Sequence, residues 1–307
     1  MTKHVAVLMG GFSSERSVSL RSGEACARAL EGEGFLVSRV DVGRDVAEVL
    51  AKLKPDAALN ALHGPGGEDG IIQGVLEFLR IPYTHSGVLA SALAAHKDKA
   101  KLVMAAAGVP VAPGKVVSRF EAAKTHVLPP PYVLKPVSEG SSYGVFIVPK
   151  DAPHPPQDLL RPDWSYGDLM LAEKYVAGRE LTCAVMGDRA LDVIEIKAAG
   201  GGWYDFDAKY KPGGSIHELP AKVKENIYQI VQDLALKAHR ALGCRGVSRT
   251  DFRYDDTPGG TGELVVLEVN TQPGMTETSL APELAAFAGV TFGELVKWMV
   301  EDASCDR

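Results

Sequence analysis

The segment from residue 246 to residue 280 constrains the fold more than any other part of the chain. Residues 246–254 and 263–270 each have the pattern of a β-strand, and the turn between them is rich in Asp, Pro and Gly. In the second strand, apolar residues alternate with a face that carries Glu268 and Asn270, the period of two that a pleated strand imposes. The sequence therefore predicts a β-hairpin around which the rest of the chain is organised.

Polar side chains are expected to converge on one face of this hairpin. Arg249 and Asp251 share a face of the first strand, and Glu268 and Asn270 share a face of the second. The two carboxylates and the amide offer only hard oxygen ligands, which suit Mg²⁺ or Mn²⁺ better than zinc. The alternative is a solvated hairpin face. The abrupt break of the strand at residues 271–275 (TQPGM) favours a metal–nucleotide site.

The runs GVSRTDFRYD and LEVNTQPGMTETSL resemble the C-terminal signature of D-alanine–D-alanine ligases, members of the ATP-grasp superfamily. The resemblance covers nearly the whole chain. It implies an ATP-grasp fold of mixed α/β and α+β class, preceded by an open parallel-sheet (pre-ATP-grasp) domain. The expected divisions are residues 1–88 for the N-terminal α/β domain, 89–172 for the central subdomain and 173–307 for the C-terminal subdomain.

Composition excludes several other classes of protein. Hydrophobic residues make up 46% of the 307 residues and charged residues 23%, an ordinary globular mixture. The net charge of -6 provides no basic surface for nucleic acid or anionic membranes. No apolar run is long enough to span a bilayer, and no secretion signal follows Met1. Four dispersed cysteines without CxxC spacing indicate reduced thiols, so we expect a soluble cytoplasmic protein.

The N-terminus has the pattern of a βαβ unit. An apolar strand at residues 5–9 leads into a glycine turn and then a helix that Ser17 or Ser19 could cap. Glu15 lies at the carboxyl end of the strand, where open α/β sheets bind ligands, and it could pair with a substrate ammonium. The alternative is an ordinary tight turn at the edge of a sheet.

A second unit ends in the run HGPGGEDG, which begins at His63 and follows a strand at residues 57–62. An apolar helical stripe over residues 71–79 comes next. A lone His is more often a hydrogen-bonded structural residue than a catalyst. The resemblance, however, places this run beside the substrate, so both interpretations of His63 stay open.

Two lysines are candidates for contact with nucleotide phosphates. Lys135 lies in the apolar strand YVLKP, where an ammonium is costly unless it meets an anion, and the loop EGSSYG after it is rich in N–H groups that can fold over phosphates. The alternative is a hairpin loop with a lysine that reaches solvent. The resemblance places Lys135 and Lys97 at the phosphates of ATP. Lys97, Lys99 and Lys101 begin a helix, and such a lysine run is usually a solvated face.

The resemblance also implies an adenine site. The segment Glu173, Lys174, Tyr175 and Val176 is similar to the family's hinge, which contacts adenine through backbone groups, and Glu180 corresponds to the residue that holds the ribose hydroxyls. Without the resemblance, Glu173 and Glu180 would be interpreted as surface charges.

A glycine-rich loop at residues 199–214 carries aromatic and charged residues, including Lys209 and Tyr210, and suggests a lid that orders on binding. A disordered surface loop is the alternative. An amphipathic helix is expected at residues 227–242, and a C-terminal helix at residues 292–299 is expected to pack on the sheet of the hairpin.

The resemblance implies ATP-dependent joining of two D-alanines through an acyl phosphate, with two Mg²⁺ or Mn²⁺ ions and a homodimeric enzyme. It also implies roles outside the ATP and metal sites. Glu15 would bind the ammonium of the first D-alanine, and Ser279 and Lys209 would bind the carboxylate of the second. Arg249 and the N–H of Gly274 would stabilise the oxyanion, and Ser141 and Tyr210 would form hydrogen bonds toward Glu15.

Two alternatives remain. A D-alanine–D-lactate or D-alanine–D-serine ligase would share the ATP residues and differ mainly in the loop that contains Lys209 and Tyr210. A non-catalytic nucleotide-binding scaffold would have no need for Arg249 or for the complete set of metal ligands.

We predict that Tyr210→Phe keeps ATP binding but shifts the product ratio toward D-alanyl-D-lactate when D-alanine and D-lactate compete. Loss of one hydrogen bond in a buried network costs about 1–3 kcal/mol, enough to change discrimination tenfold or more. The measurement is a competition assay read by mass spectrometry from about pH 6 to about pH 9. The amine is a charged ammonium near neutral pH and must lose a proton before it attacks, whereas the hydroxyl of lactate is uncharged. An unchanged ester-to-peptide ratio at every pH would contradict this role of Tyr210.

Overall fold

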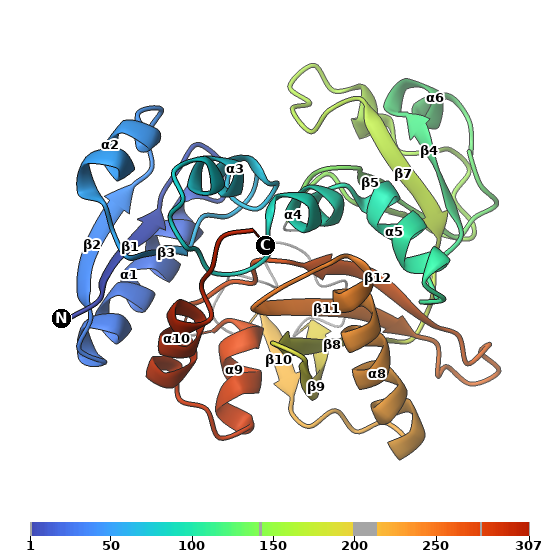
Figure 1. The fold of residues 1–307 in the computed structure, drawn as a ribbon. Coiled ribbons are helices and arrows are strands. Elements are labelled where there is room, and N and C mark those ends of the chain that lie inside the picture. Colours follow the sequence, from blue (N-terminus) through green and yellow to red (C-terminus); the bar gives the residue numbers. More distant parts are fainter. Residues whose placement is uncertain (1, 141–142, 199–213, 277, 307) are drawn as a thin grey trace.

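A computed structural model describes residues 2–140, 143–198, 214–276 and 278–306. Within these residues the strands form three sheets, which follow one another along the chain with helices packed between and around them (Figure 1).

The N-terminal sheet is parallel, with the strand order β2 (Leu36–Asp41), β1 (His4–Met9), β3 (Ala57–Asn60). Alternate residues of β1 enter different cores. Val5 and Val7 pack on the side of α1 (Arg16–Gly32), whereas Ala6 and Leu8 pack on the side of α2 (Val46–Leu53) and α3 (Ile71–Phe78). The predicted open sheet with helices on both faces is confirmed.

The predicted cap of the first helix is wrong. Helix α1 begins at Arg16, so Ser17 and Ser19 lie inside its first turns. The hydroxyl of Ser19 is fully buried; it accepts the N–H of Gly10 at 2.9 Å and donates to the carbonyl oxygen of Ala61 at 2.8 Å. Ser19 therefore satisfies backbone groups at the ends of β1 and β3 instead of capping a helix.

The second sheet is antiparallel, with the order β4 (Gly114–Ser118), β7 (Leu169–Lys174), β5 (Tyr132–Pro136), β6 (Phe146–Val148). Helix α6 (Arg119–Lys124) and the 3₁₀ turn η1 (Gln157–Leu160) pack together beside it. Strand β7 crosses the expected domain boundary at residues 172 and 173. Helices α4 (Val88–Ala95) and α5 (Lys97–Ala106) connect this sheet to the N-terminal one (Figure 1).

The third sheet contains the predicted hairpin, whose strands agree with the prediction to within one residue. Its antiparallel order is β10 (Ser215–Glu218), β9 (Arg189–Ala198), β8 (Arg179–Met186), β11 (Val247–Tyr254), β12 (Leu264–Asn270). Phe252 and Tyr254 share a core with α8 (Glu225–Ala241). Because side chains alternate along β11, Arg249 and Asp251 point to the opposite face, which α8 leaves open.

The C-terminal helix does not pack where the sequence predicts. Helix α9 (Leu280–Phe287) covers part of the third sheet, and α10 (Phe292–Glu301) packs mainly against α1 and α9. Leu295, Val296 and Met299 of α10 share one core with Val5 and Leu30 of the N-terminal unit. An amphipathic pattern identifies the buried face of a helix but not its partner. Residues near the C-terminus therefore complete the N-terminal core.

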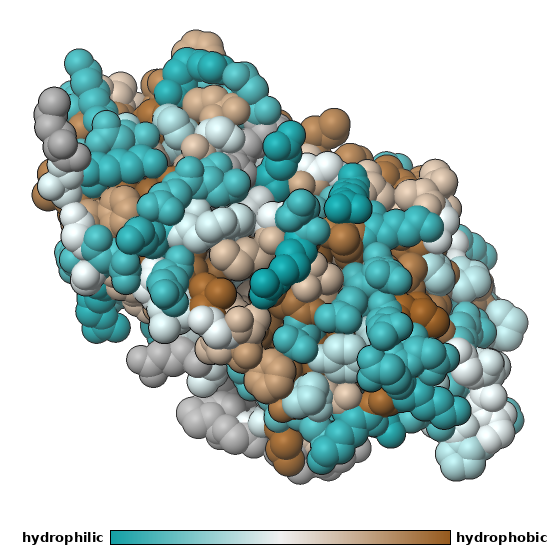
Figure 2. Space-filling view, turned by 60° about the horizontal axis from the view of Figure 1, so that its bottom comes forward, coloured by the Kyte–Doolittle hydropathy of each residue, from teal (hydrophilic) through white to brown (hydrophobic). Residues whose placement is uncertain are grey.

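The surface has the mostly hydrophilic character that the ordinary globular composition predicts. Figure 2 shows one face of the molecule, on which hydrophilic residues predominate and hydrophobic ones form separate small patches. Among the residues described, no helix has both the length and the apolar character needed to cross a membrane. The four cysteines all lie in the described part of the chain, where none of them forms a disulfide bond.

Candidate active site

The pairing of β11 with β12 brings the predicted polar residues together. Asp251 lies opposite Glu268, and Arg249 lies opposite Asn270, so the four side chains share one face of the sheet. The register shifts by one residue between Asp251 and Phe252, immediately after these pairs. The predicted convergence of the two carboxylates and the amide is confirmed.

The carboxylate of Asp251 is buried and held by four donors. Arg249 donates Nε to Oδ1 at 2.9 Å and Nη2 to Oδ2 at 2.8 Å. Thr182 Oγ1 donates to Oδ1 at 2.6 Å, and Asn270 Nδ2 donates to Oδ2 at 3.0 Å. These contacts fix the carboxylate of Asp251 in place and also orient Arg249 along the sheet.

One pocket, which we call the hinge pocket, lies between the second and third sheets. The whole predicted ATP-binding set lines it, together with two of the metal-ligand candidates. These residues are Lys97, Lys135, Glu173, Lys174, Tyr175, Val176 and Glu180, with Asp251 and Glu268. Val133, Val145 and Leu267 add apolar walls. An apolar slot edged by backbone donors and acceptors is what a flat heteroaromatic ring requires.

Lys97 connects the glycine-rich loop to the hairpin. Its ammonium donates to the carbonyl oxygen of Glu139 and lies 3.5 Å from Oε2 of Glu268. Lys97 is 11% exposed in its side chain. A mostly buried cation at this place provides positive charge between the loop and the metal-ligand candidates.

Arg253 is a site residue that sequence reasoning missed. It is buried and donates Nε to the carbonyl oxygen of Val176 at 3.0 Å and Nη2 to that of Gly178 at 2.9 Å. Its Nη1 lies 3.7 Å from Oε2 of Glu180. The alternation that places Arg249 and Asp251 on one face places Arg253 there too, so the strand pattern contained the signal.

Gly178 permits this arrangement. Its φ is +84°, and a Cβ there would overlap the carbonyl oxygen of Tyr254. A side chain would therefore push the hinge away from β11.

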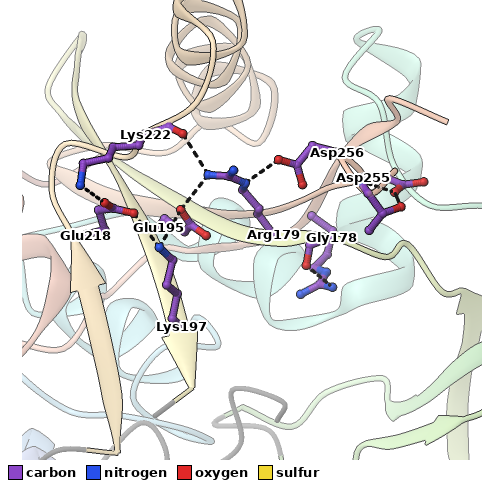
Figure 3. A network of polar contacts seen from close by, with 10 residues as sticks. Gly178, Arg179, Glu195, Lys197, Glu218, Lys222, Asp255 and Asp256 are labelled. Carbon is purple, nitrogen blue, oxygen red and sulfur yellow. Dashed lines mark hydrogen bonds and ion pairs between the residues drawn. The ribbon is translucent and has the colours of Figure 1, made fainter. Parts of the chain in front are cut away.

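An ion-pair network secures the strands beside the hinge (Figure 3). Arg179 donates Nε to Asp256 at 2.6 Å and Nη1 to Glu195 at 3.0 Å. Glu195 lies opposite Glu218 across β9 and β10, and Lys197 pairs with both carboxylates, at 3.5 and 2.7 Å. The cations of this network neutralise two like charges that directly face each other, which would otherwise weaken the pairing of these strands.

A second pocket, which we call the strand-end pocket, lies where the carboxyl ends of the N-terminal strands meet the hairpin. The predicted residues that line it are Glu15, His63, Arg249, Gly274 and Ser279, together with the metal-ligand candidates Glu268 and Asn270. Glu268 thus lines both pockets.

His63 is buried, and its Nε2 lies 3.2 Å from the hydroxyl of Ser22. Burial, with a smaller contribution from the charge of Arg249, lowers the pKa of His63 to about 4. The imidazole is therefore neutral near pH 7. This hydrogen bond supports a structural role, while the position in the pocket keeps a substrate contact possible.

Glu68 also lines the strand-end pocket and was not singled out from the sequence, although it belongs to the HGPGGEDG run. Burial and the neighbouring charge of Glu15 raise the pKa of Glu68 to about 8. Two carboxyl groups with one proton between them suit a ligand that carries an ammonium.

The far end of the strand-end pocket is the start of α9. The hydroxyl of Ser279 accepts the N–H of Thr276 at 2.9 Å, and Ser279 is the residue before the first turn of α9. A Cβ on Gly274 would lie 2.9 Å from Ser279 Oγ, so glycine permits this close approach. Free N–H groups at a helix start favour a carboxylate.

Buried amides fix the two halves of the strand-end pocket. Asn60, at the end of β3, donates Nδ2 to Gln272 Oε1 at 2.6 Å and to the carbonyl oxygen of Gly67 at 2.9 Å. Gln272 in turn donates to the carbonyl oxygen of Leu62. These contacts hold the HGPGGEDG run against the segment that leaves the hairpin.

Two sequence-based interpretations are corrected at the hinge pocket. The side chain of Glu173 is not on the surface: it is buried and pairs with both Lys101 and Lys135. Lys101 is likewise not on a solvated face, whereas Lys99 is 60% exposed. The pairing joins residues far apart in the sequence, which a local pattern does not reveal.

Three predicted residues cannot be compared with the structure. Ser141, Lys209 and Tyr210 lie outside the described residues.

The chemistry of the donor set fits a hard divalent cation. Across the described ranges, no group of three or more His, Cys, Asp or Glu side chains is arranged to hold a metal. The candidate set has two carboxylates, Asp251 and Glu268, and the third oxygen must come from the amide of Asn270. Asn270 already reaches Asp251, and all three residues lie on one sheet face.

Comparisons with known proteins agree with this geometry. A family profile described as "D-ala D-ala ligase C-terminus" matches residues 103–301. The D-alanine–D-alanine ligases of Methylocella silvestris and Beijerinckia indica are 75% and 72% identical to the chain over 307 residues, which is 100% of this chain and of each relative. The crystal structure of the Bacillus anthracis D-alanine–D-alanine ligase complexed with ATP has a TM-score of 0.81 at 28% identity, covering 98% of this chain and 97% of that one.

The raised pKa of Glu68 predicts a pH-dependent effect of Glu68→Gln. The folded protein holds a proton on Glu68 that the unfolded chain releases near pH 4.5, so the stability of the wild type falls as the pH rises toward about 8. The glutamine of the variant does not titrate, so the variant does not lose stability in this way. In metal-free buffer, the difference in free energy of unfolding between variant and wild type should grow by up to about 1.4 kcal/mol per pH unit over this window.

Denaturant titrations at several pH values measure this difference. Glu48→Gln, a change at an exposed carboxylate with 67% side-chain exposure, serves as the control and should give a nearly constant difference. Parallel pH profiles for Glu68→Gln and the wild type would contradict the raised pKa.

Proposed function

The chain belongs to the D-alanine–D-alanine ligase family, and we propose that it joins two D-alanines into D-alanyl-D-alanine for peptidoglycan synthesis, with conversion of ATP to ADP and phosphate. The expected ATP-grasp fold is confirmed by the solved ligases that match nearly the full chain. The observation that carries the proposal is the position of Glu268, which lines both the hinge pocket and the strand-end pocket. Phosphoryl transfer from a nucleotide in one to a carboxylate in the other requires such a junction.

We assign ATP to the hinge pocket. Backbone groups of residues 173–176 meet adenine, with the hinge held by Arg253, and Glu180 accepts hydrogen bonds from the ribose hydroxyls. The ammonium groups of Lys97 and Lys135 lie on the same pocket and neutralise the phosphates. Because an amine does not displace a free carboxylate oxygen, the first D-alanine is activated by receiving the γ-phosphoryl group.

We further propose that Asp251, Glu268 and Asn270 hold two Mg²⁺ or Mn²⁺ ions. When bound, these ions neutralise the charge that develops on the transferred phosphoryl group. Because four donors already occupy the oxygens of Asp251, one of them must move before Asp251 can bind a metal ion. The amide of Asn270 is uncharged and is itself a candidate ligand. It can therefore turn away from Asp251 without leaving an unpaired charge.

We assign the two amino acids to the strand-end pocket. Glu15, with Glu68 beside it, receives the first ammonium, and the start of α9 at Ser279 receives the second carboxylate together with Lys209. The deprotonated amine of the second D-alanine attacks the acyl phosphate and forms a tetrahedral oxyanion, which collapses to the peptide as the C–O bond to the leaving inorganic phosphate breaks. Arg249, fixed by two hydrogen bonds to Asp251, and the N–H of Gly274 stabilise this oxyanion without reorganisation.

The test of this function is phosphate release with ATP, Mg²⁺ and D-alanine. We predict release that depends on D-alanine in the wild type and a loss of at least about 100-fold in kcat for Glu268→Gln, because the substitution removes the charge at the junction of the two pockets. The fold should survive, since Glu268 is 27% exposed in its side chain.

The control for this experiment is Glu225→Gln, an exposed residue at the start of α8, which should keep wild-type turnover. Near-normal activity of Glu268→Gln at ordinary Mg²⁺ would show that the hairpin is not the metal site. Phosphate release by the wild type that is independent of D-alanine would contradict the ligase assignment.

We propose that the enzyme is a homodimer that uses the outer face of α3. Phe78 and Ile71 of α3 are 89% and 63% exposed, and Leu89 of the adjacent α4 is 70% exposed. Ile71 and Phe78 are seven residues apart and so lie on the same side of the helix. A second copy of the chain that packs against this side would bury all three.

We predict that Phe78→Glu converts the dimer to a monomer, because burying a carboxylate in an apolar contact is costly. Light scattering coupled to size exclusion measures the mass against the 32.7 kDa of one chain. Phe287→Glu, at a 50% exposed Phe on α9, is the matched control and should stay dimeric. A monomeric wild type, or a dimeric Phe78→Glu protein, would contradict the assigned face.

We also propose a cytoplasmic location. ATP and divalent cations are abundant there, and four cysteines that form no disulfide among the described residues are compatible with a reducing compartment.

A further inference from the structure

Three charged side chains are buried together behind the hinge pocket. Glu173 of β7 is 3% exposed in its side chain, and Lys101 of α5 and Lys135 of β5 are each 8% exposed. Oε1 of Glu173 lies 2.6 Å from the ammonium of Lys135, and Oε2 pairs with the ammonium of Lys101. One buried carboxylate thus serves two lysines, one on each oxygen.

The two lysines approach Glu173 from different sides. Lys135 and Glu173 line the hinge pocket, whereas Lys101 lines a separate groove on the outer side, between α5 and β4. Lys101 therefore does not contact the nucleotide site directly. Any influence on the nucleotide must pass through Glu173.

The burial of Glu173 makes the second lysine necessary. Burial alone would raise the pKa of this carboxyl group, but the charges of Lys135 and Lys101 hold the pKa below its ordinary value. If Lys135 were the only cation, its movement toward a phosphate would leave an unpaired charge in the interior, so Lys135 would stay bound to Glu173. With Lys101 in place, Glu173 keeps a cation when Lys135 turns to the nucleotide.

We propose that Lys101 is a positioning residue for ATP binding: by pairing with Glu173 from behind, it releases the ammonium of Lys135 to bind the phosphates. The proposal deepens the function assigned above and rests on the role of Lys135 in that function. If Lys101 contributed only packing, its substitution would not weaken ATP binding selectively.

The test compares Lys101→Met with the wild type in the full-length enzyme. The expected result is a rise of about tenfold or more in the KM for ATP and in the Kd of a non-hydrolysable ATP analogue, with a change of less than about threefold in kcat at saturating ATP. Lys99→Met, at the exposed lysine two residues earlier on α5, is the matched control and should behave as the wild type. Lys101→Arg keeps the charge and should also keep the KM near the wild-type value.

A double variant separates charge from packing. Lys101→Met combined with Glu173→Gln removes the buried carboxylate that would retain Lys135, so the KM for ATP should return to within about threefold of the wild type. A KM that stays raised in the double variant would overturn the proposal, because Lys101 would then act through packing alone. If Lys101→Met is recovered unfolded, Lys101→Gln, which keeps a donor for Glu173, takes its place with the same expected split.

Lys135→Met distinguishes the failure of this inference from the failure of the proposed function. If Lys135→Met weakens ATP binding but Lys101→Met does not, the inference is wrong and the role of Lys135 stands. If Lys135→Met leaves ATP binding unchanged, the assigned role of Lys135 is wrong and the inference about Lys101 is wrong with it.

Discussion

The pairing of β11 with β12 in one register is the constraint on which the rest of the site depends. That register places Asp251 opposite Glu268 and Arg249 opposite Asn270. A slip of β12 by one residue would move Glu268 and Asn270 to the face that packs on α8, away from Arg249 and Asp251. The hydrophobic core on that face, which includes Phe252 and Val231, therefore fixes which polar side chains lie on the opposite face. In this way an ordinary hydrophobic interaction determines where the charged groups meet.

Around the hairpin, two buried carboxylates each have more than one donor. Asp251 receives four hydrogen bonds and Glu173 pairs with two lysines. Such sharing allows one partner to leave for a substrate without exposing an unpaired charge, which would be costly in the interior. The same principle applies to Glu15 and Glu68, which face the same pocket, because one of them can hold a proton until an ammonium arrives.

The sequence predicted the parts of the fold and site that depend on local patterns. Alternation and turn residues located the hairpin to within one residue, and strand ends located Glu15 and His63. What could not be predicted depends on contacts between distant segments. The pattern of α10 shows which side is buried, but not that α1 covers it. Likewise, the local pattern of α5 does not show that Lys101 is buried. Its partner Glu173 lies on β7, 72 residues away in the sequence. The expected division of the chain at residues 88 and 172 stays a prediction.

The central claim, that one hairpin joins the nucleotide to the amino acid, is tested most directly by a crystal structure with a non-hydrolysable ATP analogue, Mn²⁺ and D-alanine. The anomalous signal of manganese locates the ions independently of the protein atoms. We expect two anomalous peaks beside Asp251, Glu268 and Asn270, with the nucleotide in the hinge pocket and D-alanine against Glu15. Manganese bound elsewhere, or a nucleotide outside the hinge pocket, would contradict it.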